Sequence, residues 1–363
     1  MLRSKRHITL SRPGRVVLLA GLLLMHAAVL AQQPKLPRLP DLPKLPKVKV
    51  PDIGILQQPD PAVRRQYIRE FEHWKTGRLV LSTRNLQFEL RSRTRRQAFI
   101  QFRPSSSVTL GAAGYYRRLG LELGFKLPTS EERQKRFGNS RIVDWSTTFY
   151  GDQFGADAFF QRYRGYYVRN GYAVDSLWRR GNPYPRYSDL AAFHLGGNVY
   201  YVFNHNRFSY RAAFTQMERQ MKSAGSFLLM TSVAIMNFSN EAQAFIPSRR
   251  LPGYNNNNLG YARFYNLALA PGYGHTFVHD RLYVSLSLFM GFGLQHQRYR
   301  MNDQIENVGQ VFRKYNMRLA TGYFGEVFYG GAGLLLDNTS SRVKDLVLSV
   351  SSPSLRLFAG VRF

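Results

Sequence analysis

The sequence predicts an all-β fold, a transmembrane up-and-down antiparallel β-barrel of about 12–14 strands preceded by a short N-terminal amphipathic helix. Apolar residues recur at every second position from about residue 78 to the terminal Phe363. The 363 residues include 26 Phe and 22 Tyr, yet a mean hydropathy of −0.32 is too polar for a bundle of transmembrane helices. The count of cysteines is 0, which excludes a disulfide framework, a thiolate metal site and a lipidated cysteine.

Residues 1–31 have the features of a cleavable signal peptide. Basic residues precede the apolar run "VVLLAGLLLMHAAVLA", and small residues precede the polar start "QQP". This order predicts cleavage after Ala31. An uncleaved anchor helix is the weaker alternative, because the run is short for a membrane span and His26 interrupts it. We therefore expect export to the outer membrane of a Gram-negative bacterium.

Residues 32–59 are rich in proline, leucine and lysine. Proline recurs at every third position from Pro34 to Pro46, and leucine follows the same step. A polyproline II helix has three residues per turn, so proline, leucine and mostly basic residues form its three edges. We expect a stiff periplasmic spacer, and the alternative is that residues 34–51 bind a periplasmic partner as a peptide ligand.

Residues 60–77 carry the signals of the short helix. Asp60 precedes Pro61, four aromatic or aliphatic residues follow at steps of four, four and three, and Gly77 ends the pattern. An N-cap, a first-turn proline and one apolar stripe predict an amphipathic helix over 61–75. It lies on the inner rim of the membrane, plugs the barrel, or packs as an ordinary helix.

Residues 78–363 form the predicted outer-membrane β-barrel domain. In "LGLELGFKL" (119–127) the leucines share one face, and in the longer run 282–294 apolar side chains occupy every second position. Such strands are typical of a barrel wall with one face towards lipid and one polar face towards a water-filled interior. The predicted strands are 78–90, 97–103, 107–116, 119–127, 141–150, 154–161, 190–203, 208–215, 225–238, 259–276, 282–295, 312–324, 326–337 and 354–363.

Long polar connections separate many of these strands, at 128–140, 165–188, 239–258, 297–311 and 338–353. If all of them lie outside, strands before residue 216 and strands after 259 run in opposite senses. Either "EAQAFIPS" hides a short strand, or one long connection within 217–258 is periplasmic. A soluble periplasmic sandwich is the alternative fold, and it requires a second sheet over the apolar faces of 119–127 and 282–294.

Three blocks resemble a known family: "YGDQFGADAFFQRYRGYYV", "YYVFNHNRFSYRAAFTQMERQMKSAGSFLL" and "LALAPGYGHTFV". They are similar to an uncharacterised Bacteroidetes envelope family catalogued as a domain of unknown function, over about residues 78–363. The resemblance implies an outer-membrane or envelope β-barrel without an assigned activity. Phe363 is also similar to the terminal aromatic residue of many outer-membrane barrels. That likeness implies a C-terminal assembly signal that the barrel-assembly machinery recognises.

No motif in the sequence indicates catalysis. His73, His194, His205, His275, His279 and His296 follow the predicted signal peptide, without an HExxH or GxSxG pattern and without metal-ligand spacing. We predict no catalytic, cofactor-binding or metal-binding residues and no cofactor, and an enzyme is not expected. An outer-membrane lipid-modifying enzyme with a Ser-His dyad built from distant strands is the third alternative.

The formal net charge is +29, and several charges fall on the polar faces of predicted strands. The candidate lumen charges are Glu122, Lys126, Asp157, Arg211, Arg356 and Arg362. They either pair within a water-lined wall or bias a pore towards anions. Basic loops are expected to meet outer-membrane lipid, including lipid phosphates, whereas nucleic acid is not an expected partner of an exported barrel.

Two roles follow from this interior. The first is a passive pore or narrow channel with an anion bias. The alternative is a structural or partner-binding envelope barrel whose lumen is filled, since a barrel of about 12–14 strands lies between packed small barrels and open porins.

Overall fold

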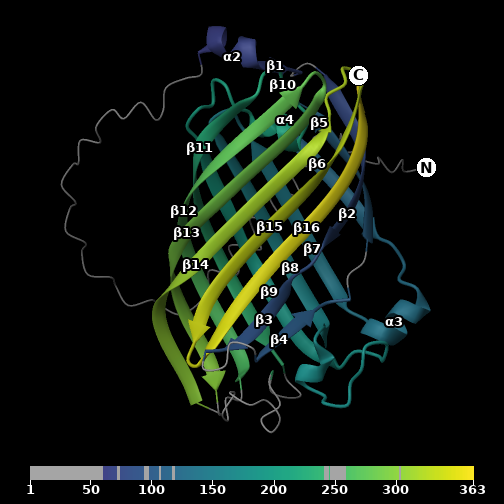
Figure 1. The fold of residues 1–363 in the computed structure, drawn as a ribbon, viewed down its shortest axis with the longest axis vertical. Helices are drawn as coiled ribbons and strands as arrows, with labels where there is room; N and C mark the ends of the chain where they lie inside the picture. The colour runs from purple at the N-terminus through teal and green to yellow at the C-terminus, as the bar shows by residue number, and fades with distance from the viewer. Residues whose placement is uncertain are drawn as a thin grey trace, which may run out of the picture. The chain divides into compact units, whose positions relative to one another are not determined.

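Fourteen strands form one sheet in the computed structural model, and ten of them close into an antiparallel barrel (Figure 1). The structure describes residues 60–71, 74–93, 98–105, 108–116, 119–240, 245, 259–301 and 304–363. The predicted all-β antiparallel barrel is confirmed. The predicted signal peptide (1–31) and spacer (32–59) lie outside the described residues.

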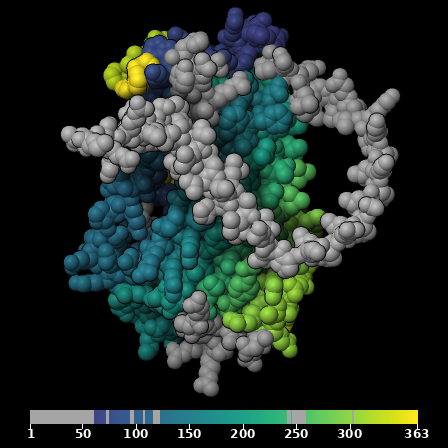
Figure 2. Space-filling model, turned by 180° about the vertical axis from the view of Figure 1, so that it is seen from behind, coloured from purple at the N-terminus to yellow at the C-terminus, as the bar shows by residue number. Residues whose placement is uncertain are grey.

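The closed ring is made by pairing each strand with its two neighbours, and it ends where β15 pairs with β16. Its members, in order around the ring, are β16 (Leu346–Arg362), β15 (Phe328–Val343), β14 (Gln304–Tyr323), β13 (Leu282–Met301), β12 (Leu259–His279), β11 (Ala224–Ser239), β9 (Arg186–Val202), β8 (Phe154–Val168), β4 (Phe99–Arg103) and β3 (Gln87–Ser92). Figure 2 shows the wall seen from behind, where the teal residues of β8 and β9 lie beside the green residues of β11.

Four further strands extend one part of the wall. They are β2 (Lys75–Arg84), β5 (Val108–Tyr116), β6 (Leu119–Lys126) and β7 (Arg141–Tyr150). Two of them, β6 and β7, widen the wall. β2 pairs with β16, β5 with β2, β6 with β5, and β7 with β8. These strands belong to the end of the barrel that also holds Phe363, which we call the proximal end; the opposite end is the distal end.

The wall has an apolar outer face near the proximal end. Along β13 the side chains from Leu282 to Leu294 at every second position are 44–68% exposed, whereas Ser285 and Ser287 face inward and are buried. The terminal strand follows the same rule, with Leu355 and Leu357 each 47% exposed. The lipid-compatible face predicted for these strands is therefore continuous across neighbouring strands.

The polarity of the two faces is inverted towards the distal end. Past Leu294 in β13, Arg298 and Arg300 point outward and are exposed, while Tyr299 and Met301 are buried inside. The predicted polar connections 297–311 and 338–353 are wrong, because β13 to β16 continue through most of both segments. Apolar and polar residues still alternate there, but the apolar residues are on the inside. The prediction looked for apolar residues on the outer face, so it did not recognise these parts of the strands.

A large apolar core fills the distal interior. It includes Phe88 and Phe102, whose rings stack with centroids 4.7 Å apart, and Phe238, which packs on Phe88 at 4.8 Å. Strands β3, β4, β8, β9, β11, β12, β13, β15 and β16 all contribute side chains to it. The distal half is therefore built like a soluble barrel, with a packed inside and a polar outside.

The segment 203–223 folds into the proximal interior and not into a wall strand. It contains α4 (Tyr210–Phe214) and β10 (Glu218–Gln220). The predicted strand 208–215 is wrong: Ser209 caps a five-residue helix by accepting a hydrogen bond from the backbone N–H of Ala212, and Tyr210, Arg211, Ala212 and Ala213 are all buried. Removing this strand resolves the conflict in strand direction, because β9 and β11 then pair directly and antiparallel.

The N-terminal helix is shorter than predicted. α2 spans Pro61–Tyr67, with Asp60 as its N-cap and proline in its first turn, as the sequence indicated. The chain then becomes β1 (Ile68–Glu70), which pairs with β10, so the predicted helical extension to residue 75 is wrong. Backbone pairing with the inner segment replaces the last helical turns. We call α2, β1, α4 and β10 with their connections the plug. α4 lies in the proximal interior, whereas α2 lies above the proximal opening (Figure 1), and Arg64 is its one buried residue.

Two short helices lie in connections. α3 (Glu131–Phe137), capped by Ser130, occupies the predicted polar connection 128–140, and the 3-10 helix η1 (Gly171–Ala173) follows β8. Among the residues that the structure describes, no helix is both long enough and apolar enough to cross a membrane.

Candidate functional site

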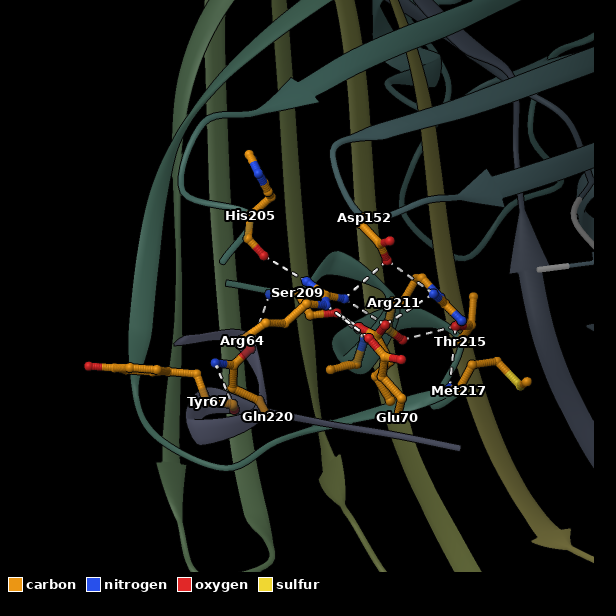
Figure 3. A network of polar contacts seen from close by, with 12 residues as sticks. Arg64, Tyr67, Glu70, Asp152, His205, Ser209, Arg211, Thr215, Met217 and Gln220 are labelled. Atoms are coloured by element: carbon orange, nitrogen blue, oxygen red, sulfur yellow. Dashed lines mark hydrogen bonds and ion pairs between the residues drawn. The ribbon is translucent and has the colours of Figure 1, made fainter. Parts of the chain in front are cut away.

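A cluster of five charged side chains joins the parts of the plug at the proximal end of the barrel (Figure 3). The guanidinium of Arg64 in α2 lies 2.7 Å from Glu218, 2.9 Å from Glu70 and 3.1 Å from Asp152. Arg211 in α4 lies 3.0 Å from Glu218 and 3.2 Å from Asp152. Figure 3 shows both arginines directed at the same carboxylates from different elements. The cluster therefore links α2, α4, β10 and the β7–β8 turn.

Electrostatics within this cluster favour charged arginine. Burial lowers the pKa of Arg64, but the carboxylates of Glu218, Asp152 and Glu70 together raise it by more, so the pKa lies above its ordinary value. Arg64 also donates to the carbonyl of His205 at 2.6 Å, so the helix is tied to the inner segment by backbone as well as by charge.

The three carboxylates of the cluster are spaced closely enough to hold a cation. Oxygens of Glu70, Asp152 and Glu218 all lie within 4.8 Å of one another. Two guanidiniums already supply positive charge to these oxygens at 2.7–3.2 Å. The arrangement is that of an internal ion-pair network.

A second network crosses the middle of the interior. Arg318 pairs with Asp157 at 2.5 Å and donates to Asn316 at 3.1 Å. Lys314 pairs with Asp337 at 2.5 Å, and Asn316 donates to the same carboxylate at 2.9 Å. The guanidinium of Arg318 also lies over the ring of Tyr200, 4.8 Å from its centroid. Positive charge is neutralised here by acids and by aromatic faces.

The six charges predicted for the lumen have different surroundings. Asp157 belongs to the middle network and Arg211 to the plug cluster. Glu122 lies 3.4 Å from Arg356 and 3.3 Å from Arg78. Arg362 donates to the backbone carbonyl of Gln216 at 2.7 Å. Lys126 is exposed, with its ammonium 3.4 Å from the carbonyl of Ser140.

Most of the partners of these charges were not identified from the sequence. Arg318, Lys314 and Asp337 follow strand alternation and could have been found by extending the polar face of 312–324 and 326–337. Arg64, Asp152 and Glu218 lie in a helix, a turn and a three-residue strand. These short elements carry no periodic signal, so only the folded chain brings them together.

A cavity of about 220 Å³ lies between β6 and β7 and is lined by residues of both strands. Its inner lining includes Arg84, Asp144 and Arg356, and its outer lining includes Leu123 and Trp145, which are 67% and 55% exposed. Arg84 pairs with Asp144 at 3.2 Å. Smaller cavities of about 70 and 50 Å³ share Arg84 with it.

The five histidines that the structure describes do not form the rim cluster that a lipid-modifying enzyme requires. Within the described part of the chain, His194 contacts Gln161 at 3.1 Å, His205 contacts the carbonyl of Val202 at 3.3 Å, and His275 contacts Tyr273 at 3.2 Å. Neither His279 nor His296 makes a hydrogen bond to a serine or a carboxylate among these residues.

The family model described as "Domain of unknown function (DUF4421)" matches residues 59–363. No curated protein matches the chain significantly.

Several solved structures align with the chain. The outer membrane protease OmpT from Escherichia coli aligns with a TM-score of 0.36 at 8% identity, covering 81% of this chain and 98% of its own. The Pseudomonas putida toluene transporter TodX aligns with a TM-score of 0.28 at 9% identity, covering 79% and 89%. OccAB4 of Acinetobacter baumannii aligns with a TM-score of 0.17 at 8% identity, covering 79% and 98%.

Proposed function

Because the chain belongs to this family of unknown function, and its fold is a closed antiparallel barrel, we propose from its own geometry that it is an outer-membrane envelope barrel with a filled lumen. Its role is structural or partner-binding. This is the alternative reading of the sequence, and it replaces the passive pore as the favoured function.

The outer face supports placement in a membrane. The apolar residues of β13 run from Leu282 to Leu294. At ~3.4 Å per residue this run is about 40 Å long, and at a tilt of about 40° it covers about 30 Å of bilayer. That height matches the hydrocarbon core of a typical bilayer. The polar outer face beyond Leu294 lies outside the hydrocarbon on the distal side.

The observation that carries the proposed role is packing of the interior at two levels. The distal core closes the barrel with buried side chains such as Phe88, Phe102 and Phe238. At the proximal end, the buried Ala212 and Ala213 of α4 pack against Tyr283 of β13 and Phe324, which follows β14. Between them, among the described residues, Arg211, Lys314 and Arg318 each pair with a carboxylate, so this part of the interior offers neither the open bore nor the ring of free arginines that an anion pore needs.

We call the apolar outer face of the wall the apolar belt. Exposed arginines on its distal side support a contact with lipid phosphates. Arg162, Arg298, Arg300 and Arg342 are exposed on three different strands of the wall. Guanidinium groups match phosphate oxygens in bidentate geometry. The proposed location places them at the outer head-group level. Export by a signal peptide, a Bacteroidetes origin and a partner for the 34–51 spacer remain predictions.

Conductance in planar bilayers tests the proposed function. We expect no single-channel steps from reconstituted wild-type protein under conditions in which an open porin conducts. Insertion is verified separately by flotation with liposomes and by the heat-dependent mobility of folded barrels. Steady, anion-selective conductance steps from inserted protein would contradict the filled lumen and support the passive pore instead.

A further inference from the structure

The wall of the barrel has a seam where two adjacent strands do not pair. β6 pairs with β5 on one side, and β7 pairs with β8 on the other. No ladder joins β6 to β7 among the described residues. At the distal end of the seam β4 pairs directly with β8, through Phe102 and Val168, so the seam is closed there.

Free strand edges at this position need a polar occupant. A backbone N–H or C=O without a partner costs several kcal/mol in hydrocarbon, which is why membrane barrels close without edges. Unpaired edges are tolerated where they border a polar cavity. The seam has such a cavity, about 220 Å³ in volume, lined by residues of both β6 and β7.

The charges around the cavity favour an anion. Its charged lining is two guanidiniums, Arg84 and Arg356, and two carboxylates, Glu122 and Asp144. Arg78 does not line the cavity but lies 3.3 Å from Glu122, so this one carboxylate is shared between Arg78 and Arg356. Arg356 makes one ion pair, at 3.4 Å, among the described residues, and its side chain is 28% exposed. A guanidinium has five N–H donors, so Arg356 keeps donors for a ligand.

The mouth of the cavity is apolar. Leu123 and Trp145 line it, and Phe125 and Val143 continue the outward face on each side at 65% and 58% exposure. The volume is smaller than the roughly 300–1,000 Å³ of pockets that enclose whole small molecules. It suits a head group, while an alkyl chain lies outside along the apolar face.

We propose that the seam between β6 and β7 binds an anionic amphiphile, with its carboxylate or phosphate head at Arg356 and Arg84 and its alkyl chain against Leu123 and Trp145. The proposal rests on the membrane location given above. The ligand enters sideways from the bilayer, so binding requires no axial pore.

Quenching of Trp145 by a brominated alkyl carboxylate tests the proposal. The chain has 3 tryptophans, so Trp74→Phe and Trp178→Phe leave Trp145 as the single reporter. In nanodiscs of zwitterionic lipid we expect saturable quenching, and Arg356→Gln should weaken binding at least tenfold, since a charge-assisted hydrogen bond is lost. Arg65→Gln is the matched control, because Arg65 is exposed on α2 and does not line the cavity, and it should leave the affinity unchanged.

Other probes identify the source and the chemistry of the ligand. Competition by anionic phospholipid in the nanodisc points to a membrane lipid, and its absence points to a free amphiphile. The brominated alcohol of the same length is the probe without a charge. If it quenches Trp145 as strongly as the carboxylate does, and Arg356→Gln changes neither, the probes simply partition into the lipid and the proposal is overturned.

Hydrogen exchange on the wild-type protein provides a second test. The edge amides of β6 and β7 should exchange faster than those of β13, which is paired on both sides. Full protection of 119–126 and 141–150 without ligand shows that the strands pair and the seam is closed, and it refutes the site. Failure of liposome flotation refutes the membrane location instead, so the two failures are distinguishable.

Discussion

Replacement of Arg211 by methionine should release the plug without unfolding the barrel. Arg211 is 1% exposed and is one of two guanidiniums that serve three carboxylates, at 3.0 Å from Glu218 and 3.2 Å from Asp152. At an effective dielectric constant of about 20, each contact is worth about 5–6 kcal/mol before desolvation is counted. Removing one partner of a buried pair costs about 3–5 kcal/mol in measured cases.

This loss shifts the equilibrium between the docked and the undocked plug. A cost of about 3–5 kcal/mol raises the undocked fraction roughly 150- to 4,000-fold. The wall keeps its backbone ladders and its distal core, so the thermal unfolding of the barrel should change much less than the exposure of the plug.

Labelling of a buried cysteine measures this exposure. Ala213 in α4 is 0% exposed and the chain has 0 cysteines, so Ala213→Cys gives a single internal thiol. When opening and closing are fast, its rate of reaction with a maleimide follows the open population. We expect at least a hundredfold faster labelling in Arg211→Met.

The control variant is Arg207→Met, an exposed residue of the same inner segment, which should change the rate no more than about twofold. Equal rates in Arg211→Met and Arg207→Met refute the inference that the charge cluster holds the plug.

Three further outcomes are expected. Leu286→Arg on the lipid face should destabilise the folded barrel by about 2–4 kcal/mol in a urea titration, whereas His296→Arg beyond the belt should cost little; equal costs contradict the placement of the belt. Burial raises the pKa of Tyr210 to about 12, so the folded state holds this proton more tightly and stability is lost as the pH rises from about 10 to about 12. Tyr210→Phe should reduce that loss, and an unchanged alkaline titration would count against the buried phenol. Deletion of Phe363, whose backbone pairs with Lys75 at 2.8 and 2.9 Å while its ring is 69% exposed, should lower the yield of assembled barrel in cells; a normal yield argues against an assembly signal.

The closed ring differs from a simple up-and-down barrel in one region. β2 and β3 pair with successive parts of β16. β5 pairs with β2 and β4 pairs with β3, so β5 and β4 together occupy the next position around the wall. β6 and β7 are inserted only in the proximal half, so the barrel is wider there than at the distal end. This local widening accommodates the plug and leaves the seam.

The sequence by itself determined the alternation of the wall, because successive side chains of a strand point to opposite faces whatever the strand pairs with. The outward faces of 282–294 and 354–363 and the inward direction of Arg356 and Asp157 follow from that local geometry. The N-cap at Asp60 is equally local, since it depends on a few neighbouring residues.

Only the tertiary structure decided which strands pair, how the interior is filled and where the wall stays open. The run 208–215 alternates like a strand, yet it forms a helix inside the barrel, where Arg211 pairs with Glu218 of the same inner segment and with Asp152 of the distant β7–β8 turn. The inversion of polarity beyond Leu294 depends on a core assembled from nine strands. Those contacts join residues far apart in the chain, so no local period encodes them.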